Sequence, residues 1–214
     1  MNVLIVGATG KMAQLVAENL TQYPDVKVLL FARNPDKFDE SLLAFNPTII
    51  KGNAIDTTFL TKTLVENNID LVYSNVGGVD LADQTASIIK SMNDSNVKRL
   101  IFISASGAHH EVPGNFGEWN EQAISAYLPG FRESFELLDK SDIDYTMVRP
   151  AWLTDYDEVD YETTGRHEPF KGTEVSRKSV ADFVTKVILN PDTYVRDSIG
   201  LNKPNTDADK PSWM

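Results

Sequence analysis

The sequence of 214 residues contains no cysteine. Disulfide bonds, thiolate metal sites and a thiol nucleophile are therefore excluded, and a reducing compartment such as the cytoplasm is the expected setting. Long apolar stretches are also missing, and the first residues do not form a basic segment followed by a signal-like apolar core. We therefore expect a soluble, cytoplasmic protein that does not bind membranes.

Basic side chains are scarce relative to acidic ones. Lysine and arginine number 20 against 31 aspartates and glutamates, which gives a formal net charge of −11. Nucleic acids and anionic membrane surfaces require a basic face, so neither is expected as a partner. An anionic small molecule remains compatible, because charges beyond a Debye length of about 8 Å are largely screened and a nearby cation can outweigh them.

The segment Asn2–Met12, NVLIVGATGKM, predicts the opening of a dinucleotide-binding fold. Residues 3–6 are all apolar, as is typical of a parallel strand buried on both faces. Gly7 permits the sharp turn that must follow, and Gly10 lets the backbone approach a pyrophosphate at the N-terminus of the next helix. The third small residue is Ala13, so the spacing is Gly-x-x-Gly-x-x-Ala. A bare tight turn is the alternative, but the place between a buried strand and an amphipathic helix favours the dinucleotide site.

Strands and helices alternate along the chain, as apolar periodicity and capping signals indicate. The expected strands cover residues 3–6, 26–31, 48–51, 71–74, 99–104 and 145–148, with a short one near 199. The expected helices cover residues 11–22, 35–45, 56–67, 81–93, 130–140 and 179–190. Such alternation requires parallel strands joined by right-handed helical crossovers, with ligands at the carboxyl ends of the strands.

We therefore expect one α/β domain over residues 1–214, a Rossmann-type doubly wound parallel sheet with a small C-terminal substrate lobe. No repeat, low-complexity tract or linker divides the chain. Residues 150–173 are polar, acidic and irregular, and residues 150–176 are expected to belong to the lobe. A long connection is expected at residues 105–126, where glycines and aromatic side chains suit a lid.

The end of the second strand indicates which dinucleotide is bound. Proteins that favour NAD place a carboxylate there, about 20 residues after the glycines, to accept the ribose hydroxyls. This chain has Arg33 instead, which can pair with the 2′-phosphate of NADP(H), although a solvated surface arginine is the alternative. Asn53 follows the third strand and can bond the adenine, although local backbone bonds explain a turn asparagine equally well.

Two further strand ends converge on the same crevice. Asn75, Val76 and Gly77 follow the fourth strand, where glycine lets the backbone approach the middle of the cofactor. Ser104 and Ser106 follow the fifth strand and bring hydroxyl groups near the nicotinamide. Both sets extend the expected site from the adenine end toward the reactive end of the cofactor.

Together these motifs resemble the atypical short-chain dehydrogenase/reductases, of the NmrA-like and flavin reductase-related NAD(P)-binding kind. The matching segments are Gly7–Gly10, Arg33, Asn75–Gly77, Ser104–Gly107, Asp144–Pro150 and Ser176–Ala181. The resemblance implies a Rossmann fold, NADP(H) as cofactor and hydride transfer, with the strand that ends at Pro150 lining the nicotinamide pocket. The expected cofactor-binding residues are Gly7, Thr9, Gly10, Lys11, Met12, Arg33, Asn53, Ala54, Asn75, Val76, Gly77, Ser104, Pro150 and Ala151.

The chain departs from this family at the catalytic pair. Active members pair a tyrosine with a lysine four residues later on a helix, and the lysine lowers the pKa of the tyrosine that passes a proton to the carbonyl. Tyr127 stands where the tyrosine is expected, but Phe131 occupies the lysine position, and Arg132 projects about 100° away from it on a helix. Tyr127 is a candidate general acid, with an ordinary half-buried tyrosine as the alternative. It is expected just before the helix, because Pro129 and Gly130 follow.

Histidine supplies another candidate. Of the three histidines in the chain, His109 and His110 follow the serine-bearing strand closely enough to reach the nicotinamide. Histidine titrates near neutral pH, so His110 joins Ser104 and Tyr127 as a candidate catalytic residue, with a solvated loop pair as the competing interpretation. No third ligand has suitable spacing, so no metal site is expected.

The function predicted from these features is an NADPH-binding oxidoreductase. It would transfer hydride to or from a small carbonyl, quinone or flavin-like acceptor. One alternative is a non-enzymatic sensor that reads the NADP(H) ratio, which the missing lysine favours, and another is an epimerase or isomerase that retains its cofactor. The expected partner is a small-molecule substrate, and a homodimer is left open.

Overall fold

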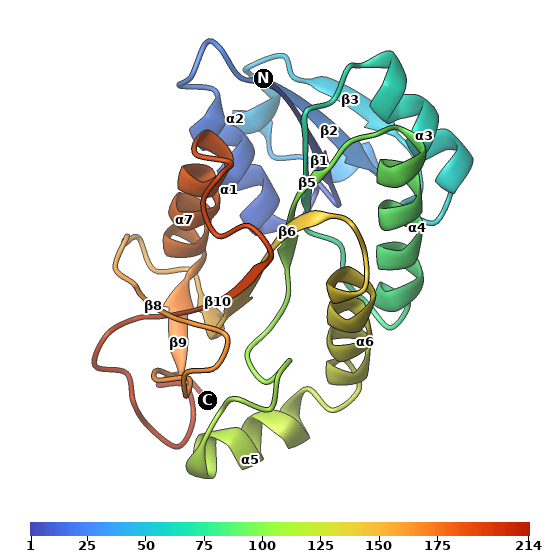
Figure 1. Cartoon of the computed structure of the whole chain (residues 1–214). Coiled ribbons are helices and arrows are strands. Elements are labelled where there is room, and N and C mark those ends of the chain that lie inside the picture. Colours follow the sequence, from blue (N-terminus) through green and yellow to red (C-terminus); the bar gives the residue numbers. More distant parts are fainter.

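The computed structural model describes residues 1–214 and has a central sheet of eight strands (Figure 1). The strand order is β3-β2-β1-β4-β5-β6-β10-β8, and neighbouring strands are parallel except that β8 runs antiparallel to β10. These strands are β1 (Asn2–Val6), β2 (Lys27–Ala32), β3 (Thr48–Lys51), β4 (Leu71–Ser74), β5 (Arg99–Ile103), β6 (Asp144–Pro150), β8 (Glu162–Thr164) and β10 (Asp197–Asn202). The expected Rossmann-type α/β fold is confirmed.

The apolar run of β1 lies in the middle of the sheet. Ile5 faces Leu30 of β2 on one side and Tyr73 of β4 on the other. From β1 the chain continues outward through β2 and β3 and then returns to β4 on the opposite side of β1. The carboxyl ends of β1 and β4 therefore border the crevice that forms where a parallel sheet changes direction, which is where such folds bind ligands.

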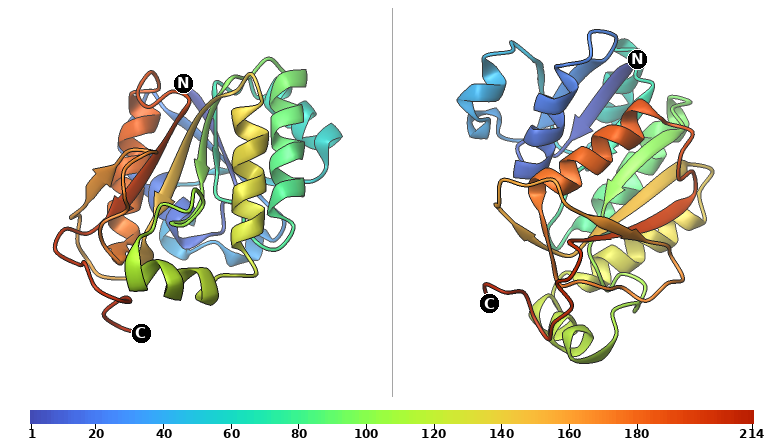
Figure 2. Two further views of the ribbon diagram at one scale, coloured as in Figure 1. Left: turned by 60° about the horizontal axis from the view of Figure 1, so that its bottom comes forward. Right: turned by 90° about the vertical axis from the view of Figure 1, so that its left-hand side faces the viewer.

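Helices cover both faces of the sheet (Figure 2). One face carries α1 (Lys11–Leu20), α2 (Glu40–Leu43) and α7 (Arg177–Leu189), and the other carries α3 (Thr57–Glu66), α4 (Leu81–Asp94) and α6 (Leu128–Asp139). None of the helices combines the length and the apolar composition that crossing a membrane requires.

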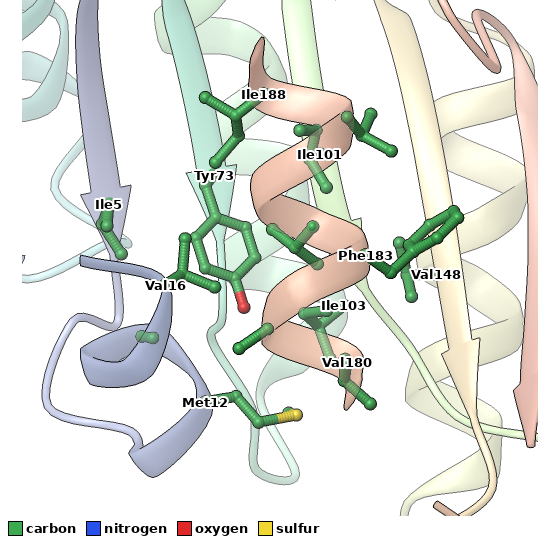
Figure 3. Close-up of a cluster of buried hydrophobic side chains, with 14 of the residues drawn as sticks. Ile5, Met12, Val16, Tyr73, Ile101, Ile103, Val148, Val180, Phe183 and Ile188 are labelled. Carbon is green, nitrogen blue, oxygen red and sulfur yellow. The ribbon is translucent and has the colours of Figure 1, made fainter. Parts of the chain in front are cut away.

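Helix α7 closes the core on its face of the sheet. Figure 3 shows Val180 and Phe183 of α7 above Tyr73, Ile101 and Val148 on three neighbouring strands. All five side chains are at most 4% exposed, and full burial of an apolar side chain of this size contributes about 1.5–3 kcal/mol. Burial of this patch therefore fixes α7, whose first residues reach the carboxyl edge of the sheet.

Side-chain hydrogen bonds cap the N-termini of two of these helices. The Asp56 carboxylate accepts a hydrogen bond from the Phe59 amide at 3.0 Å, at the start of α3. The Ser176 hydroxyl accepts one from the Ser179 amide at 3.0 Å, at the start of α7. Each bond satisfies an amide that has no partner within the helix.

The helix expected at residues 35–45 is divided into two short pieces. A 3₁₀ turn, η1, covers Pro35–Lys37, and α2 begins only at Glu40. Phe38 and Asp39 between them are extended, with ψ angles of 142° and 143°. In this conformation the Phe38 ring is buried in the core, and the Asp39 amide donates to the Gln14 side chain at 2.7 Å. A tertiary partner thus takes the amide that a continuous helix would have used.

The two segments expected to be irregular contain regular elements. The long connection after β5 holds helix α5 (Gly114–Ala123), and the segment expected to form the lobe holds β7 (Trp152–Thr154), β8 and β9 (Glu174–Ser176). Strand β8 extends the main sheet, whereas β7 and β9 pair in parallel as a separate sheet of two strands. These strands are only three residues long, so their sequence lacks the alternation by which longer strands are recognised.

A buried ion pair ties the end of β6 to the connection after β5. The side chains of Arg149 and Glu111 are 0% and 5% exposed and form a salt bridge. The Arg149 guanidinium also donates to the Ser198 hydroxyl at 2.9 Å and to the Gly165 carbonyl at 3.2 Å. Burial raises the pKa of Glu111, but the Arg149 charge and several hydrogen bonds outweigh it and hold that pKa below its usual value.

Loss of the Glu111 charge is expected to destabilise the fold strongly. Glu111→Gln leaves the Arg149 guanidinium buried without a counter-charge, and we expect the free energy of unfolding in urea to fall by about 3–5 kcal/mol. The matched control is Glu136→Gln, which removes the exposed Lys140–Glu136 pair on α6 and is expected to cost less than about 1 kcal/mol. Similar losses for the two variants would contradict the structural role of the buried pair.

Candidate functional site

Two hollows lie side by side at the carboxyl ends of the strands. The first, the polar hollow, has a volume of about 280 Å³, and the second, the aromatic hollow, has a volume of about 440 Å³. Asn75 and Val76, at the end of β4, line both. The polar hollow is lined by Val6, Gly7, Thr9, Gly10, Phe31, Ala32, Arg33, Asn34, Lys37, Gly52, Ala54, Asn75, Val76, Gly77 and Gln84. The aromatic hollow is lined by Met12, Asn75, Val76, Ile103, Ser104, Ala105, Ser106, Asn120, Ile124, Phe131, Pro150, Ala151, Trp152, Leu153, Arg177 and Trp213.

The glycine turn after β1 packs directly against the end of β4. Gly7 has a φ of +76°, and a Cβ atom there would lie 2.7 Å from the Asn75 carbonyl oxygen. A Cβ atom at Gly10 would lie 2.2 Å from the Asn75 side-chain nitrogen. The contact at Gly7 is with backbone atoms, so glycine is needed there for packing as well as for the positive φ. At Gly10 a side chain would require the Asn75 side chain to move.

Helix α1 begins at this turn with free amide groups. Its N-cap is Gly10, which offers no side-chain acceptor, and no acidic residue lies in its first turn. The first amides of a helix lack partners within the helix and carry partial positive charge. This end of α1 is therefore suited to an anionic group such as a pyrophosphate.

Two cations border the polar hollow, and no carboxylate lines it. Arg33, at the end of β2, and Lys37, in η1, are both exposed. Neither side chain takes part in any of the salt bridges of the structure. Lys37 was not expected in the site, yet its position four residues after Arg33, in a turn opened by Pro35, is a local signal that could have identified it.

Most of the expected cofactor-binding residues line one of the two hollows. Those in the polar hollow are Gly7, Thr9, Gly10, Arg33, Ala54, Asn75, Val76 and Gly77. Those in the aromatic hollow are Met12, Asn75, Val76, Ser104, Pro150 and Ala151. The expected set did not include Val6, Phe31, Ala32, Asn34, Lys37, Gly52 and Gln84 in the first hollow or Arg177 and Trp213, among others, in the second.

Lys11 and Asn53 line neither hollow. The Lys11 ammonium pairs with the Asp155 carboxylate at 3.0 Å, which draws it toward the C-terminal segment. The Asn53 side chain accepts a long hydrogen bond, 3.4 Å, from the Ile55 amide. This is the local turn bond that was the alternative to adenine binding.

A hydrogen-bonded network fixes the wall of the aromatic hollow. The side chain of Asn120 is fully buried, accepts from the Trp152 indole at 2.8 Å and donates to the Ser106 carbonyl at 3.0 Å. Trp152 also packs against Trp119 and Trp213, with ring centroids 4.7 Å and 6.1 Å away. The hollow therefore presents an aromatic surface that suits a flat ligand.

Ser104 supplies a hydroxyl group that the protein itself does not use. The residue is 4% exposed, and its side-chain oxygen has no hydrogen-bond partner. Its amide donates to the Val148 carbonyl at 2.8 Å, which holds the residue at the end of β5. A buried hydroxyl without a partner costs free energy, so this group is available to a ligand in the aromatic hollow.

Tyr127 lies outside the aromatic hollow. It is the N-cap of α6, as expected from the proline and glycine that follow, and its side chain is 47% exposed. Phe131, one helical turn further on, lines the hollow instead. The hollow thus contains neither member of the tyrosine and lysine pair.

His110 also points away from the aromatic hollow. The backbone turns after β5 at Gly107 and His110, which have φ angles of +91° and +57°, and Glu111 is drawn inward by Arg149. The exposed ring of His110 lies 3.6 Å from Glu121 and faces a different hollow. His109 beside it is partly buried, and burial and the Arg149 charge lower its pKa to about 4, so the ring is neutral near pH 7.

Comparison with known proteins agrees with this geometry. The family described as NAD(P)H-binding matches residues 7–191, from the glycine turn to the end of α7. The chain belongs to this family. Its expected resemblance to atypical short-chain dehydrogenase/reductases is confirmed, and so is the expected nicotinamide dinucleotide cofactor.

Relatives of known structure or activity extend the comparison. A Rossmann-fold NAD(P)-binding family protein of Shigella flexneri is 40% identical, with 100% of this chain and 98% of that chain covered and a TM-score of 0.84. A short-chain dehydrogenase/reductase of Veillonella parvula, solved in complex with NADP, is 28% identical over 99% and 98% of the two chains, with a TM-score of 0.90. A phenylcoumaran benzylic ether reductase of Ginkgo biloba is 32% identical over 46% of this chain and 34% of its own length.

A side chain at position 10 is expected to impair cofactor binding. In Gly10→Ala the new methyl group must displace the Asn75 side chain, which lines both hollows. We expect the Kd for NADPH, measured by calorimetry, to rise by at least about tenfold. Gly165→Ala is the control, because a Cβ atom there meets its nearest neighbour at an ordinary 3.5 Å. Unchanged affinity in a folded Gly10→Ala protein would refute this account of the turn.

Proposed function

We propose that the protein is an NADP(H)-dependent oxidoreductase that reduces a flat, conjugated acceptor of the quinone or flavin type. One observation carries the proposal: a polar hollow bordered by free cations joins, at Asn75 and Val76, an aromatic hollow that contains no acid able to protonate a carbonyl. The NADP complex of the Veillonella parvula relative and the reductase activity named for the Ginkgo biloba relative support the cofactor and the reaction class.

The polar hollow is assigned to the adenosine end of the cofactor. Arg33 and Lys37 would hold the 2′-phosphate, since both are free of internal ion pairs and a guanidinium matches a phosphate in shape and charge. The free amides of α1 would hold the pyrophosphate beside Gly10. The shared lining at Asn75 then directs the nicotinamide into the aromatic hollow. When bound there, the cofactor supplies a hydride.

The aromatic hollow contains no general acid, and this distinguishes carbonyl acceptors from quinones and flavins. Reduction of an aldehyde or ketone by hydride generates an alkoxide, which requires a general acid, and Tyr127 and His110 both lie outside the hollow. A quinone that takes up a hydride forms a delocalised hydroquinone anion, and a flavin forms a delocalised reduced anion. Either can take its proton from water. The Ser104 hydroxyl, free of internal partners, can donate a hydrogen bond to the oxygen or nitrogen that gains negative charge.

One observation favours a second function, a sensor of the NADP(H) ratio. The lysine position of the catalytic pair holds Phe131, and Tyr127 is exposed. A protein that only reads the cofactor needs neither residue. The aromatic hollow argues for the enzyme, because a sensor needs no second, largely apolar cavity beside the nicotinamide.

The acceptor panel separates these functions. NADPH oxidation is followed by the absorbance of the reduced nicotinamide with aldehydes, quinones and flavins in turn. We expect turnover with quinones or flavins and a rate in Tyr127→Phe within a few-fold of the original. Ser104→Ala is expected to slow the reaction by about tenfold or more, as loss of a donor to a developing charge does.

Two results of this panel would contradict the proposal. Turnover of aldehydes that falls by about 10²–10⁴ in Tyr127→Phe would identify a dehydrogenase with a tyrosine acid. Tight binding of NADPH without oxidation by any acceptor would identify the sensor.

Cofactor preference gives a second prediction. We expect NADPH to bind at least about tenfold more tightly than NADH, because a charge-assisted bond to the phosphate contributes about 1.5–3 kcal/mol. Arg33→Ala should weaken NADPH binding and leave NADH binding unchanged in calorimetry. Lys27→Ala is the control, since this exposed lysine lies at the opposite end of the same strand. Equal affinities for the two dinucleotides in the unaltered protein would rule out this role for Arg33.

A further inference from the structure

We propose that Arg177 binds an anionic group of the acceptor, so that the substrates of this protein are flat conjugated molecules that carry a carboxylate or phosphate. The proposal rests on the oxidoreductase function above and specifies its substrate class. It follows from the lining of the aromatic hollow, from the hydrogen bonds of Arg177 and from the charges around it.

Arg177 is the one ionisable residue among those that line the aromatic hollow. It is the first residue of α7, and its side chain is 25% exposed. The other lining residues are apolar, aromatic or neutral and polar. A mostly buried charge at the border of a largely apolar cavity favours a ligand group of opposite charge, so this guanidinium marks where a ligand is expected to be charged.

Most of the donors of Arg177 are unused within the protein. Its side chain makes one hydrogen bond, from Nη1 to the Asp155 carboxylate at 2.7 Å. A guanidinium has five N–H donors in a planar fork, which matches a carboxylate or a phosphate through two parallel bonds. The remaining donors are therefore available to an anion in the hollow.

The cluster around Arg177 keeps a positive charge. Asp155 is 63% exposed and also accepts from the Lys11 ammonium at 3.0 Å, so one carboxylate serves two cations. The neighbouring Lys178 is paired separately with Asp157 at 2.6 Å. The group of Lys11, Asp155 and Arg177 thus has a net charge of +1 in a chain whose formal net charge is −11.

This local charge matters because the chain as a whole has an excess of acidic residues. Over distances beyond about 8 Å the acidic surface is screened, so the nearest cation decides whether an anion binds. Inside the aromatic hollow that cation is Arg177, with the rings of Phe131, Trp152 and Trp213 beside it to pack on a flat ligand. Together they describe a ligand with a conjugated ring system and one negative group.

The experiment uses ligands that cannot be reduced, so that binding is measured without turnover. Calorimetry with the full chain saturated with NADP⁺ compares 2-naphthoate and 2-naphthyl phosphate with neutral 2-naphthamide. We expect both anions to bind more tightly than the amide, by about tenfold or more, as a charge-assisted hydrogen bond implies. The tighter of the two anions then distinguishes a carboxylate from a phosphate substrate.

Three variants test the residue itself. Arg177→Gln should abolish the preference for the anions and leave the affinity for 2-naphthamide and for NADP⁺ unchanged. Lys178→Gln, at the next position, should keep the preference. Asp155→Asn should strengthen anion binding, because it removes the carboxylate charge that competes with the ligand for Arg177, and this opposite change keeps the test decisive if Arg177→Gln does not fold.

The proposal is overturned if the unaltered protein binds naphthoate, naphthyl phosphate and naphthamide equally. It is also overturned if Arg177→Gln weakens NADP⁺ binding as much as anion binding, because Arg177 would then belong to the cofactor site. Neither result depends on catalysis. A protein that prefers the anions through Arg177 but oxidises NADPH with no acceptor would support the anion site and contradict the proposed oxidoreductase.

Discussion

The buried ion pair between Arg149 and Glu111 is the interaction on which the carboxyl edge of the sheet depends. Its guanidinium is completely enclosed and joins four separate segments: the end of β6, the connection after β5, the turn after β8 and the start of β10. The residue that follows Arg149 is Pro150, whose carbonyl accepts from the Ser106 amide at 3.1 Å. Both Pro150 and Ser106 line the aromatic hollow. The buried Arg149 charge therefore holds part of the wall of this cavity in place.

The two hollows divide recognition between electrostatics and shape. The polar hollow offers cations and free helix amides and lacks carboxylates, so it selects for a phosphorylated ligand. The aromatic hollow offers two indole rings, the Ser104 hydroxyl without a hydrogen-bond partner and the Arg177 guanidinium. Their common wall at Asn75 also explains the two glycines of the turn after β1, because a Cβ atom at Gly7 or Gly10 would meet Asn75 at less than 3 Å.

Local patterns in the sequence predicted the parts of the fold that depend on neighbouring residues. The apolar run of β1 and the start of α3, which Asp56 caps, need no distant partner, and the strand at 3–6 and the helix at 56–67 are found close to where they are expected. Arg33 was predicted to be a site residue because its position after β2 follows from chain order alone, and it lines the polar hollow. Where a tertiary contact intervenes, the expectation failed: the helix expected at 35–45 breaks because Asp39 donates to Gln14, which lies 25 residues earlier.

The candidate site was predicted on its cofactor side better than on its acceptor side for the same reason. Arg177 and Trp213 reach the aromatic hollow from segments that lie far from the glycine turn in sequence. The expectation for His110 assumed that the connection after β5 continues over the crevice. The pairing of Glu111 with Arg149, 38 residues away, turns that connection aside, and no local pattern reveals such a partner.

The positions of the indole rings determine what the intrinsic fluorescence of this protein measures. The chain has three tryptophans. Trp152 and Trp213 line the aromatic hollow, and Trp119 packs on Trp152. No indole lies elsewhere in the fold, so all of the tryptophan emission, as distinct from that of the seven tyrosines, originates at or beside this cavity. We therefore expect the wavelength and intensity of the tryptophan emission to change when a ligand enters the cavity, without any attached dye.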